Sequence, residues 1–306
     1  MRLRPEIALV CIATAVIAAA VGLFSVRACY AEESIEPLEY ADARLLGMGY
    51  SYVGLSSVPN PLYSNPASFG FTKGMLSLSF GVGFGGSGGD GSFKYLAATD
   101  EEREGGTGGF AWAQYKRLDE CLELTNNSYN YAVGKAFKDT GSLGIGFRYL
   151  RGAEHSGHTL LSSWQGFATD IGVMLRYKAI TLGVLARDVT TTHLKSTDGA
   201  VRAVPPTYSL GLSLTPWKGA VVALDVHNVS VRDHATTGTV SGGFEGRIGS
   251  YIALRGGVIL KDGFEGGVTA YTGGLGIFLG DFELGYACLV SDEQIKKQCI
   301  SIMKRF

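Results

Sequence analysis

The sequence contains few residues whose types and spacing could support catalysis. Residues 85–89, Gly-Gly-Ser-Gly-Gly, fit the G-x-S-x-G pattern of a serine nucleophile, and residues 81–86 fit the G-x-G-x-x-G pattern of dinucleotide-binding proteins. Both patterns need a helix directly after the glycines, and no helical pattern follows either segment. His155 and His158 have only Glu154 beside them, which gives fewer ligands than a metal site needs. We therefore expect no catalytic residue, no metal and no cofactor.

The remaining polar residues lie in segments of about ten residues that alternate apolar with small or polar side chains. In the segment 204–216, Tyr208, Leu210, Leu212 and Leu214 alternate with Ser and Gly. A period of two places the two sets on opposite faces of a β-strand. About fourteen such segments begin near residues 75, 91, 107, 126, 142, 164, 180, 204, 219, 239, 251, 264, 281 and 297. An even number of antiparallel strands can close into a barrel without edges.

The polar face of these segments carries most of their charged side chains. If Tyr208 and Leu210 face lipid, the opposite set faces the barrel lumen. This set comprises Arg148, Asp170, Arg176, Arg187, Asp225, His227, Glu245, Arg247, Arg255 and Glu283. An arginine facing lipid costs about 2–4 kcal/mol near the membrane midplane, so the inward placement is favoured. In the lumen these charges form either a salt-bridged scaffold or a polar permeation path. An outer-membrane lipase is disfavoured because its triad would have to face lipid, whereas His227 faces inward.

The lengths of the connections predict the orientation in a membrane. Short periplasmic turns and long outer loops are typical of transmembrane barrels. With a periplasmic N-terminus, the periplasmic connections include the tight turns 139–141, 178–179, 217–219, 249–250 and 280–281. The outer connections are predicted to be long loops at 118–125, 153–163, 190–203, 230–238 and 291–296. The long connection 99–106 and the short connection 261–263 depart from this rule.

The composition agrees with a folded barrel. An apolar fraction of 46% excludes intrinsic disorder, and a net charge of −1 gives no reason to expect a nucleic-acid partner. The one long apolar run, residues 7–24, follows Arg2 and Arg4 and precedes Cys-Tyr-Ala at 29–31, which predicts a signal peptide over 1–31. An uncleaved membrane anchor and a lipoprotein cut before Cys29 stay open. For the residues after the signal peptide, the alternative to a transmembrane barrel is a soluble fold, namely a secreted β-sandwich or solenoid.

The end of the sequence carries two further signals. Phe306 follows Ile302 and Ile300 at a spacing of two, and a terminal aromatic residue on an alternating strand resembles the signal read by the barrel-assembly machinery of outer membranes. Lys304 shares that face, where its charged head can extend to the interface.

Cys121, Cys288 and Cys299 follow the predicted signal peptide. Cys288 and Cys299 flank one outer connection, and cross-strand neighbours are close enough for a disulfide. The alternation puts the two cysteines on different faces, so a disulfide between them stays open.

Two segments before the first predicted strand resemble the N-terminal hatch of FadL-type outer-membrane proteins. They are residues 41–53, Ala-Asp-Ala-Arg-Leu-Leu-Gly-Met-Gly-Tyr-Ser-Tyr-Val, and residues 62–68, Leu-Tyr-Ser-Asn-Pro-Ala-Ser. The shared pattern is A-R-x-x-G-M-G followed by N-P-A. The superfamily includes fatty-acid transporters, aromatic-hydrocarbon transporters and PorV-type barrels. Segments 167–189 and 205–226 look like paired strands of its shorter members.

The resemblance implies an all-β fold, a transmembrane antiparallel barrel of about fourteen strands. It divides the chain into a signal peptide (1–31), an N-terminal extension with a hatch or plug in the lumen (32–73) and the barrel (74–306). The implied hatch or gate residues are Gly47, Met48, Gly49, Asn65, Pro66 and Ala67. The chain is shorter than the fatty-acid transporters, and its outer connections lack their long apolar insert.

The function implied is a channel of the bacterial outer membrane that takes up hydrophobic small molecules, such as long-chain fatty acids, past a mobile plug. The implied partners are membrane lipid, the hydrophobic ligand and the barrel-assembly machinery, with Phe306 as the assembly signal. One alternative is a non-transporting barrel that acts as a surface antigen or a secretion partner, like PorV. Another is a general diffusion pore, against which the plug argues.

Overall fold

The structure is a computed structural model that describes residues 41–56, 60, 62–72, 76–85, 91–100, 106–119, 122–197, 199–232, 235–261 and 269–306. Two short helices, α2 (Ala43–Gly47) and η2 (Pro66–Phe71), precede the first strand. The strands are β1 (Ser77–Gly85), β2 (Gly91–Thr99), β3 (Thr107–Asp119), β4 (Leu122–Phe137), β5 (Gly141–Ser156), β6 (Thr159–Tyr177), β7 (Ile180–Arg187), β8 (Thr192–Ser196), β9 (Val201–Val204), β10 (Thr207–Leu214), β11 (Ala220–Arg232), β12 (Ala235–Ile248), β13 (Ile252–Lys261), β14 (Ala270–Leu279), β15 (Phe282–Ser291) and β16 (Gln294–Arg305). Among the described residues, no helix is both long enough and apolar enough to cross a membrane.

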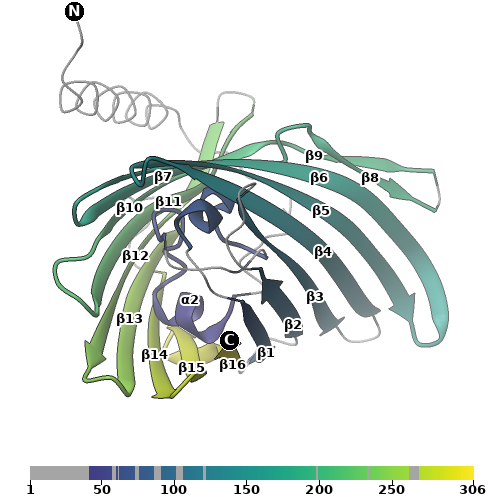
Figure 1. The fold of residues 1–306 in the computed structure, drawn as a ribbon. Coiled ribbons are helices and arrows are strands. Elements are labelled where there is room, and N and C mark those ends of the chain that lie inside the picture. Colours follow the sequence, from purple (N-terminus) through teal and green to yellow (C-terminus); the bar gives the residue numbers. More distant parts are fainter. Residues whose placement is uncertain are drawn as a thin grey trace, which may run out of the picture.

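Fourteen of these strands form a closed antiparallel barrel, and only β8 and β9 lie outside the ring (Figure 1). Each strand of the ring pairs with the next one along the chain, with β7 pairing directly with β10. The ring closes where β16 pairs with β1, from Ser77 opposite Arg305 to Gly85 opposite Lys297. The prediction of an all-β closed barrel of about fourteen strands is therefore confirmed.

The predicted long loops were wrong. At 118–125, 153–163, 230–238 and 291–296 the strands run on through the predicted loops, leaving connections as short as Asp292 and Glu293, whose positive φ angles of 51° and 60° suit a tight hairpin turn. The predicted loop 190–203 contains the hairpin β8–β9, which pairs with β6. Polar side chains do not end a strand in water, because the ladder still satisfies the backbone there.

One predicted strand start differs in the structure, and several features of the sequence fall outside the described residues. The strand expected to begin near residue 264 begins at Ala270. Residues 1–40, 86–90 and 121 lie outside the described residues, and with them lie the predicted signal peptide, most of the G-x-S-x-G motif and Cys121. Residues 81–85 of the G-x-G-x-x-G segment lie in β1.

The two ends of the barrel differ. At one end, neighbouring strands are joined by the tight turns near residues 139, 178, 249 and 280. We call it the short-turn end. At the other end, the long-strand end, β4, β5 and β6 extend over 16, 16 and 19 residues. A membrane crossing needs about 9–11 strand residues, so these strands project well beyond a bilayer.

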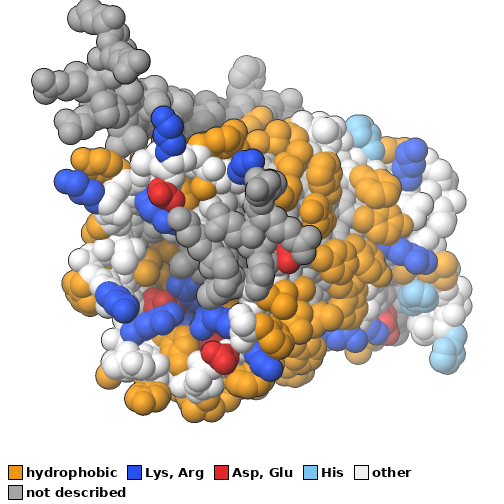
Figure 2. Space-filling view, viewed as in Figure 1, with side chains coloured by type: hydrophobic (Ala, Val, Ile, Leu, Met, Phe, Trp, Pro, Cys, Tyr) orange, Lys and Arg blue, Asp and Glu red, His pale blue; other side chains and the backbone are white. Residues whose placement is uncertain are grey.

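The outer wall carries an apolar belt (Figure 2). Exposed hydrophobic side chains on it include Phe110, Tyr131, Phe147, Ile171, Leu212, Leu224, Phe244, Leu254, Leu284 and Ile300. On β6 the belt runs from Phe167 to Tyr177, eleven residues whose ten steps cover about 33 Å of strand. At the usual strand tilt this is about 25 Å of height, which matches the apolar band of transmembrane barrels.

Candidate functional site

Residues 41–56 and 62–72 lie inside the barrel, and we call them the plug (Figure 1). Helix α2 packs against β13–β16, whereas η2 packs against β3–β6. Both helices begin at a capping side chain. The Asp42 carboxylate accepts the Leu45 N–H at 2.7 Å, and the Asn65 amide oxygen accepts the Ala67 N–H at 3.0 Å. Burial raises the pKa of Asp42 above its usual range because the carboxylate is held away from water.

The wall beneath the plug is built largely from glycines. A Cβ atom on Gly172 would lie 1.9 Å from the Asn65 Oδ1, and one on Gly183 would lie 1.9 Å from the Val53 carbonyl oxygen. Gly144, Gly211, Gly243 and Gly257 face plug backbone at similarly short range. Any side chain at these positions would push the plug off the wall, which accounts for part of the high glycine content of this barrel.

The second hatch motif is held mainly by one amide side chain and by backbone contacts. The Asn65 Nδ2 donates to the carbonyl of Val53 in the plug at 3.2 Å and to the carbonyl of Val184 on β7 at 3.1 Å. The Ala67 carbonyl accepts the Ser142 hydroxyl at 2.7 Å. Pro66 lies against Gly144, with no room for a Cβ between them. The same Nδ2 lies 3.4 Å from the carbonyl oxygen of Val173 on β6, so Asn65 joins two plug segments to two wall strands.

The first hatch motif lies on the opposite part of the wall. The Gly47 carbonyl accepts the Thr272 hydroxyl at 3.1 Å. Met48 is fully buried at the C-terminal end of α2, with its carbonyl against Gly243. Gly49 has a φ angle of 64°, in the left-handed region that favours glycine, so the chain can turn directly after α2.

An ion-pair chain links α2 to the wall and to the last strand. The Arg44 guanidinium donates to both oxygens of Glu245 at 2.8 and 3.1 Å. Glu245 also accepts Arg255 at 2.8 Å, and Glu283 accepts Arg255 and Arg305, both at 2.7 Å. We call these five residues the α2 ion-pair chain. Because they are largely removed from water, losing one partner leaves a buried charge without compensation.

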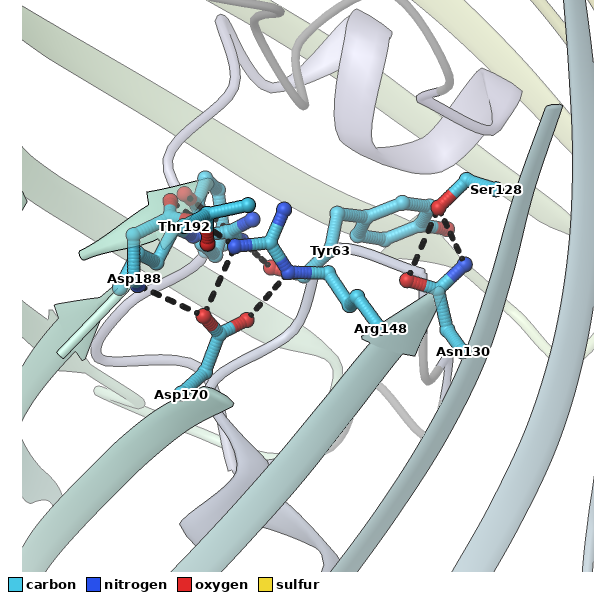
Figure 3. Close-up of polar contacts among 9 residues, drawn as sticks. Tyr63, Ser128, Asn130, Arg148, Asp170, Asp188 and Thr192 are labelled. Atoms are coloured by element: carbon cyan, nitrogen blue, oxygen red, sulfur yellow. Dashed lines mark hydrogen bonds and ion pairs between the residues drawn. The ribbon is translucent and has the colours of Figure 1, made fainter. Parts of the chain in front are cut away.

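A second group of buried charges lies on β5–β7 (Figure 3). Arg148 binds Asp170 through two hydrogen bonds of 2.8 and 2.9 Å and Asp188 through a third of 2.9 Å. Asp188 also accepts the Thr192 hydroxyl, at the base of the hairpin β8–β9. Arg148, Asp170, Asp188 and Thr192 form what we call the β6 charge cluster. It ties the root of that hairpin to the wall.

The irregular plug segment between the two helices is held by hydrogen bonds from its backbone to buried charged residues. Arg187 donates to the Tyr63 carbonyl at 2.7 Å. Asp225 accepts the backbone N–H groups of Tyr52 and Val53 at 2.5 and 2.6 Å. The His227 ring stacks on Tyr52 with the ring centroids 5.0 Å apart.

The predicted lumenal residues are therefore not equivalent. Eight are buried inside the barrel and contact the plug or one another: Arg148, Asp170, Arg187, Asp225, His227, Glu245, Arg255 and Glu283. Arg176 and Arg247 are not buried and lie near the short-turn end. Arg176 stacks over Phe71 of the plug and Arg247 over Phe278 of the wall, with the guanidinium carbons 3.9 and 4.4 Å from the ring centroids. Neither of these two forms an ion pair with any residue in the described part of the chain.

Sequence reasoning missed four plug or lumen residues that complete these groups, namely Asp42, Arg44, Tyr52 and Asp188. Arg44 stands in the A-R-x-x-G-M-G segment, and Asp42 directly precedes that segment at a helix start, so a capping signal was available. Asp188 gave no signal, because its partner Arg148 is 40 residues away.

The remaining candidates lie apart from the plug. His155 and His158 lie at the tip of β5–β6, and the described residues hold no group of three or more potential metal ligands. Cys288 and Cys299 are both free thiols, and Cys299 points inward with its thiol 3.5 Å from the Ala41 carbonyl. Adjacent register positions put the two on opposite faces, so the disulfide left open by the sequence does not form.

Phe306 ends the chain with its ring exposed on the outer wall. The Lys304 ammonium lies 4.4 Å from the centroid of that ring, and the Phe306 N–H donates to the Leu76 carbonyl at 2.9 Å.

Comparison with known proteins gives matches in structure only. No protein-family model and no curated protein sequence matches the chain. The toluene transporter TbuX of Ralstonia pickettii is 12% identical and superposes with a TM-score of 0.61, over 88% of this chain and 99% of that one. The toluene transporter TodX of Pseudomonas putida is 12% identical, with a TM-score of 0.62 over 88% of this chain and 97% of that one. A FadL homologue of Pseudomonas aeruginosa is 12% identical, with a TM-score of 0.55 over 87% of this chain and 98% of that one. In its fold, this chain is a FadL-type barrel.

Proposed function

We propose that the chain is a bacterial outer-membrane channel that takes up hydrophobic small molecules past its plug. The apolar belt of about 25 Å suits a bilayer, because such a surface is unfavourable in water. The short-turn end then faces the periplasm and the long-strand end faces outward. The TbuX and TodX structures, which share the fold, are described as toluene transporters.

The observation that carries this proposal is the apolar contact between part of the plug and the wall. Tyr50, Leu55 and Leu62 of the plug are buried in one cluster with Phe93 of the wall, and the partly buried Leu289 of the wall packs against this cluster. A hydrophobic ligand that moves along such a surface leaves no polar group without a partner, whereas a hydrated solute would lose its water there. A plug seated in this way also argues against a general diffusion pore.

The two hatch motifs are the proposed gate. Asn65, Pro66 and Ala67 hold the η2 half of the plug, and Gly47, Met48 and Gly49 hold the α2 half. Release of the Asn65 hydrogen bonds would free η2 from β6 and β7 without breaking an ion pair. The ligand class on this proposal is apolar, and long-chain fatty acids and aromatic hydrocarbons are its two candidate members.

A non-transporting barrel that docks a protein partner is the second candidate. The observations that favour it are the buried ion pairs on the plug and the projection of β4–β6 with the hairpin β8–β9. In a barrel with that function, the plug stays in place and the projecting strands bind the protein partner. The two functions therefore differ in whether plug movement is required.

A reversible lock on the plug separates the two functions. The hydroxyl oxygens of Ser51 in the plug and Ser241 on β12 lie 3.1 Å apart, so a Ser51→Cys, Ser241→Cys variant places two thiols at bonding range. The background lacks Cys121, Cys288 and Cys299. Uptake of a fluorescent fatty acid and of labelled toluene is measured in bacterial cells without their own FadL-type transporter.

Oxidation of the lock should abolish uptake, and reduction should restore it, because the plug must leave its seat. The single Ser51→Cys variant is the control for the substitution itself. Equal uptake by the oxidised and reduced forms would contradict the proposal and favour the partner-docking barrel.

A further inference from the structure

A row of outward-facing side chains crosses the wall at the long-strand end. Strand pairing places its members directly opposite one another on β2, β3, β4, β5, β6 and β8. In order around the wall they are Lys94, Gln114, Asn127, Arg151, Gln165 and Lys195. We call this set the polar row. With neighbouring strands about 4.8 Å apart, it spans roughly 24 Å.

The polar row carries three positive charges and no acidic residue. None of Lys94, Arg151 and Lys195 forms an ion pair with a carboxylate of the described residues, and the Lys94 ammonium lies 5.5 Å from the centroid of the Trp112 ring. Two residues farther from the belt on β3, Lys116 does bind an acid, Glu123, at 2.9 Å. Lys94, Arg151 and Lys195 therefore lie at one level of the wall without a carboxylate partner among the described residues.

That level lies just outside the apolar belt. The next outward-facing row, two residues nearer the short-turn end, is also in register and consists of Trp112, Tyr129, Tyr149 and Phe167. Two residues along a tilted strand correspond to about 5 Å of height. Aromatic rings of this kind lie at the level of lipid head groups. Toward the far end of β4–β6, Figure 2 shows hydrophobic side chains giving way to polar and basic ones.

We propose that the polar row binds phosphate groups on the head groups of outer-leaflet lipids. Arginine and lysine form strong charge-assisted hydrogen bonds to phosphate, and the amides between them supply neutral donors. The belt directly below accommodates the acyl chains of the same molecules, which favours a lipid over free phosphate. This inference rests on the membrane orientation given in the proposed function.

The test measures lipid binding to the purified, folded barrel by native mass spectrometry. The probe is diphosphoryl lipid A, compared with its dephosphorylated form. The variant Lys94→Gln, Arg151→Gln, Lys195→Gln removes the three charges of the row. The control variant Lys138→Asn, Lys178→Asn, Lys218→Asn removes three charges at the short-turn end, where asparagine tolerates the positive φ angles of Lys138 and Lys178.

The polar-row variant should bind diphosphoryl lipid A roughly 100-fold more weakly, since each basic residue near an anionic surface contributes about fivefold. The control variant and the dephosphorylated lipid should show no such loss. Equal losses in both variants, or no loss in either, would overturn the proposal. Displacement of the lipid by millimolar inorganic phosphate would overturn the choice of lipid as the ligand. Fatty-acid displacement, measured on the same samples, should stay unchanged, so failure of lipid binding is distinguishable from failure of the uptake function.

Discussion

The two halves of the plug are held against the barrel by different interactions. The α2 half is tied by charge, through Arg44 to Glu245 and on to Arg255, Glu283 and Arg305. The η2 half, residues 62–72, has no such ion pair among its described residues. It is held by Asn65, by the Arg187 hydrogen bond to the Tyr63 carbonyl and by close backbone contact with glycines. Losing one partner of a buried ion pair costs more free energy than losing one amide hydrogen bond, because a buried charge is left without compensation. The η2 half is thus the part of the plug that can leave its seat at lower cost.

The largest expected effect is loss of the charge contact. Glu245→Gln removes the carboxylate shared by Arg44 and Arg255 and leaves two buried guanidinium groups without it. Breaking a buried pair costs about 3–5 kcal/mol, so the free energy of unfolding should fall by that order. Denaturant unfolding of the refolded barrel measures this change. Glu123→Gln, which breaks the exposed pair with Lys116, is the matched control and should leave the free energy of unfolding almost unchanged, because solvent screens this pair.

A smaller effect is expected at the glycine seat. Gly183→Ala places a methyl group against the Val53 carbonyl, which forces the plug away from β7 at a cost of about 1–3 kcal/mol. The displaced plug should also let ions pass, which planar-bilayer conductance measures. Gly246→Ala is the matched control, because a Cβ there meets no atom within 4 Å. Closed channels in both variants would show that the seat does not hold the plug in place.

The smallest effect is expected at the amide. Asn65→Ala removes the cap of η2 and the donor to Val184, together worth about 1–2 kcal/mol. Uptake of a fluorescent fatty acid should become faster, because the seated state of the plug is weakened. Asn127→Ala, on the outer wall, serves as the control and should leave uptake unchanged. A slower rate in Asn65→Ala would mean that Asn65 assists passage rather than restraining it.

Strand alternation predicted the barrel but could not predict where its strands end. Tyr208, Leu210, Leu212 and Leu214 revealed a strand because lipid contact demands an apolar residue at every second position. Beyond the membrane, the outward positions of a strand no longer need apolar residues. The ends of β5 and β6 therefore lack the alternation, and loops were predicted there. The hatch motifs located the plug, but the pairing of Arg44 with Glu245 joins residues 201 positions apart, which no local pattern encodes. The predicted cleavage after residue 31 stays a prediction.

Hydrogen exchange of plug amides tests most directly whether the two halves are held independently. The amides compared are those of Leu46 and Met48 in the α2 half and those of Ser68 and Thr72 in the η2 half, all of which donate within the plug. Asn65→Ala should speed exchange at Ser68 and Thr72 and leave Leu46 and Met48 protected, whereas Glu245→Gln should do the reverse. If either variant exposed all four amides together, the plug would be a single unit and the account would be contradicted.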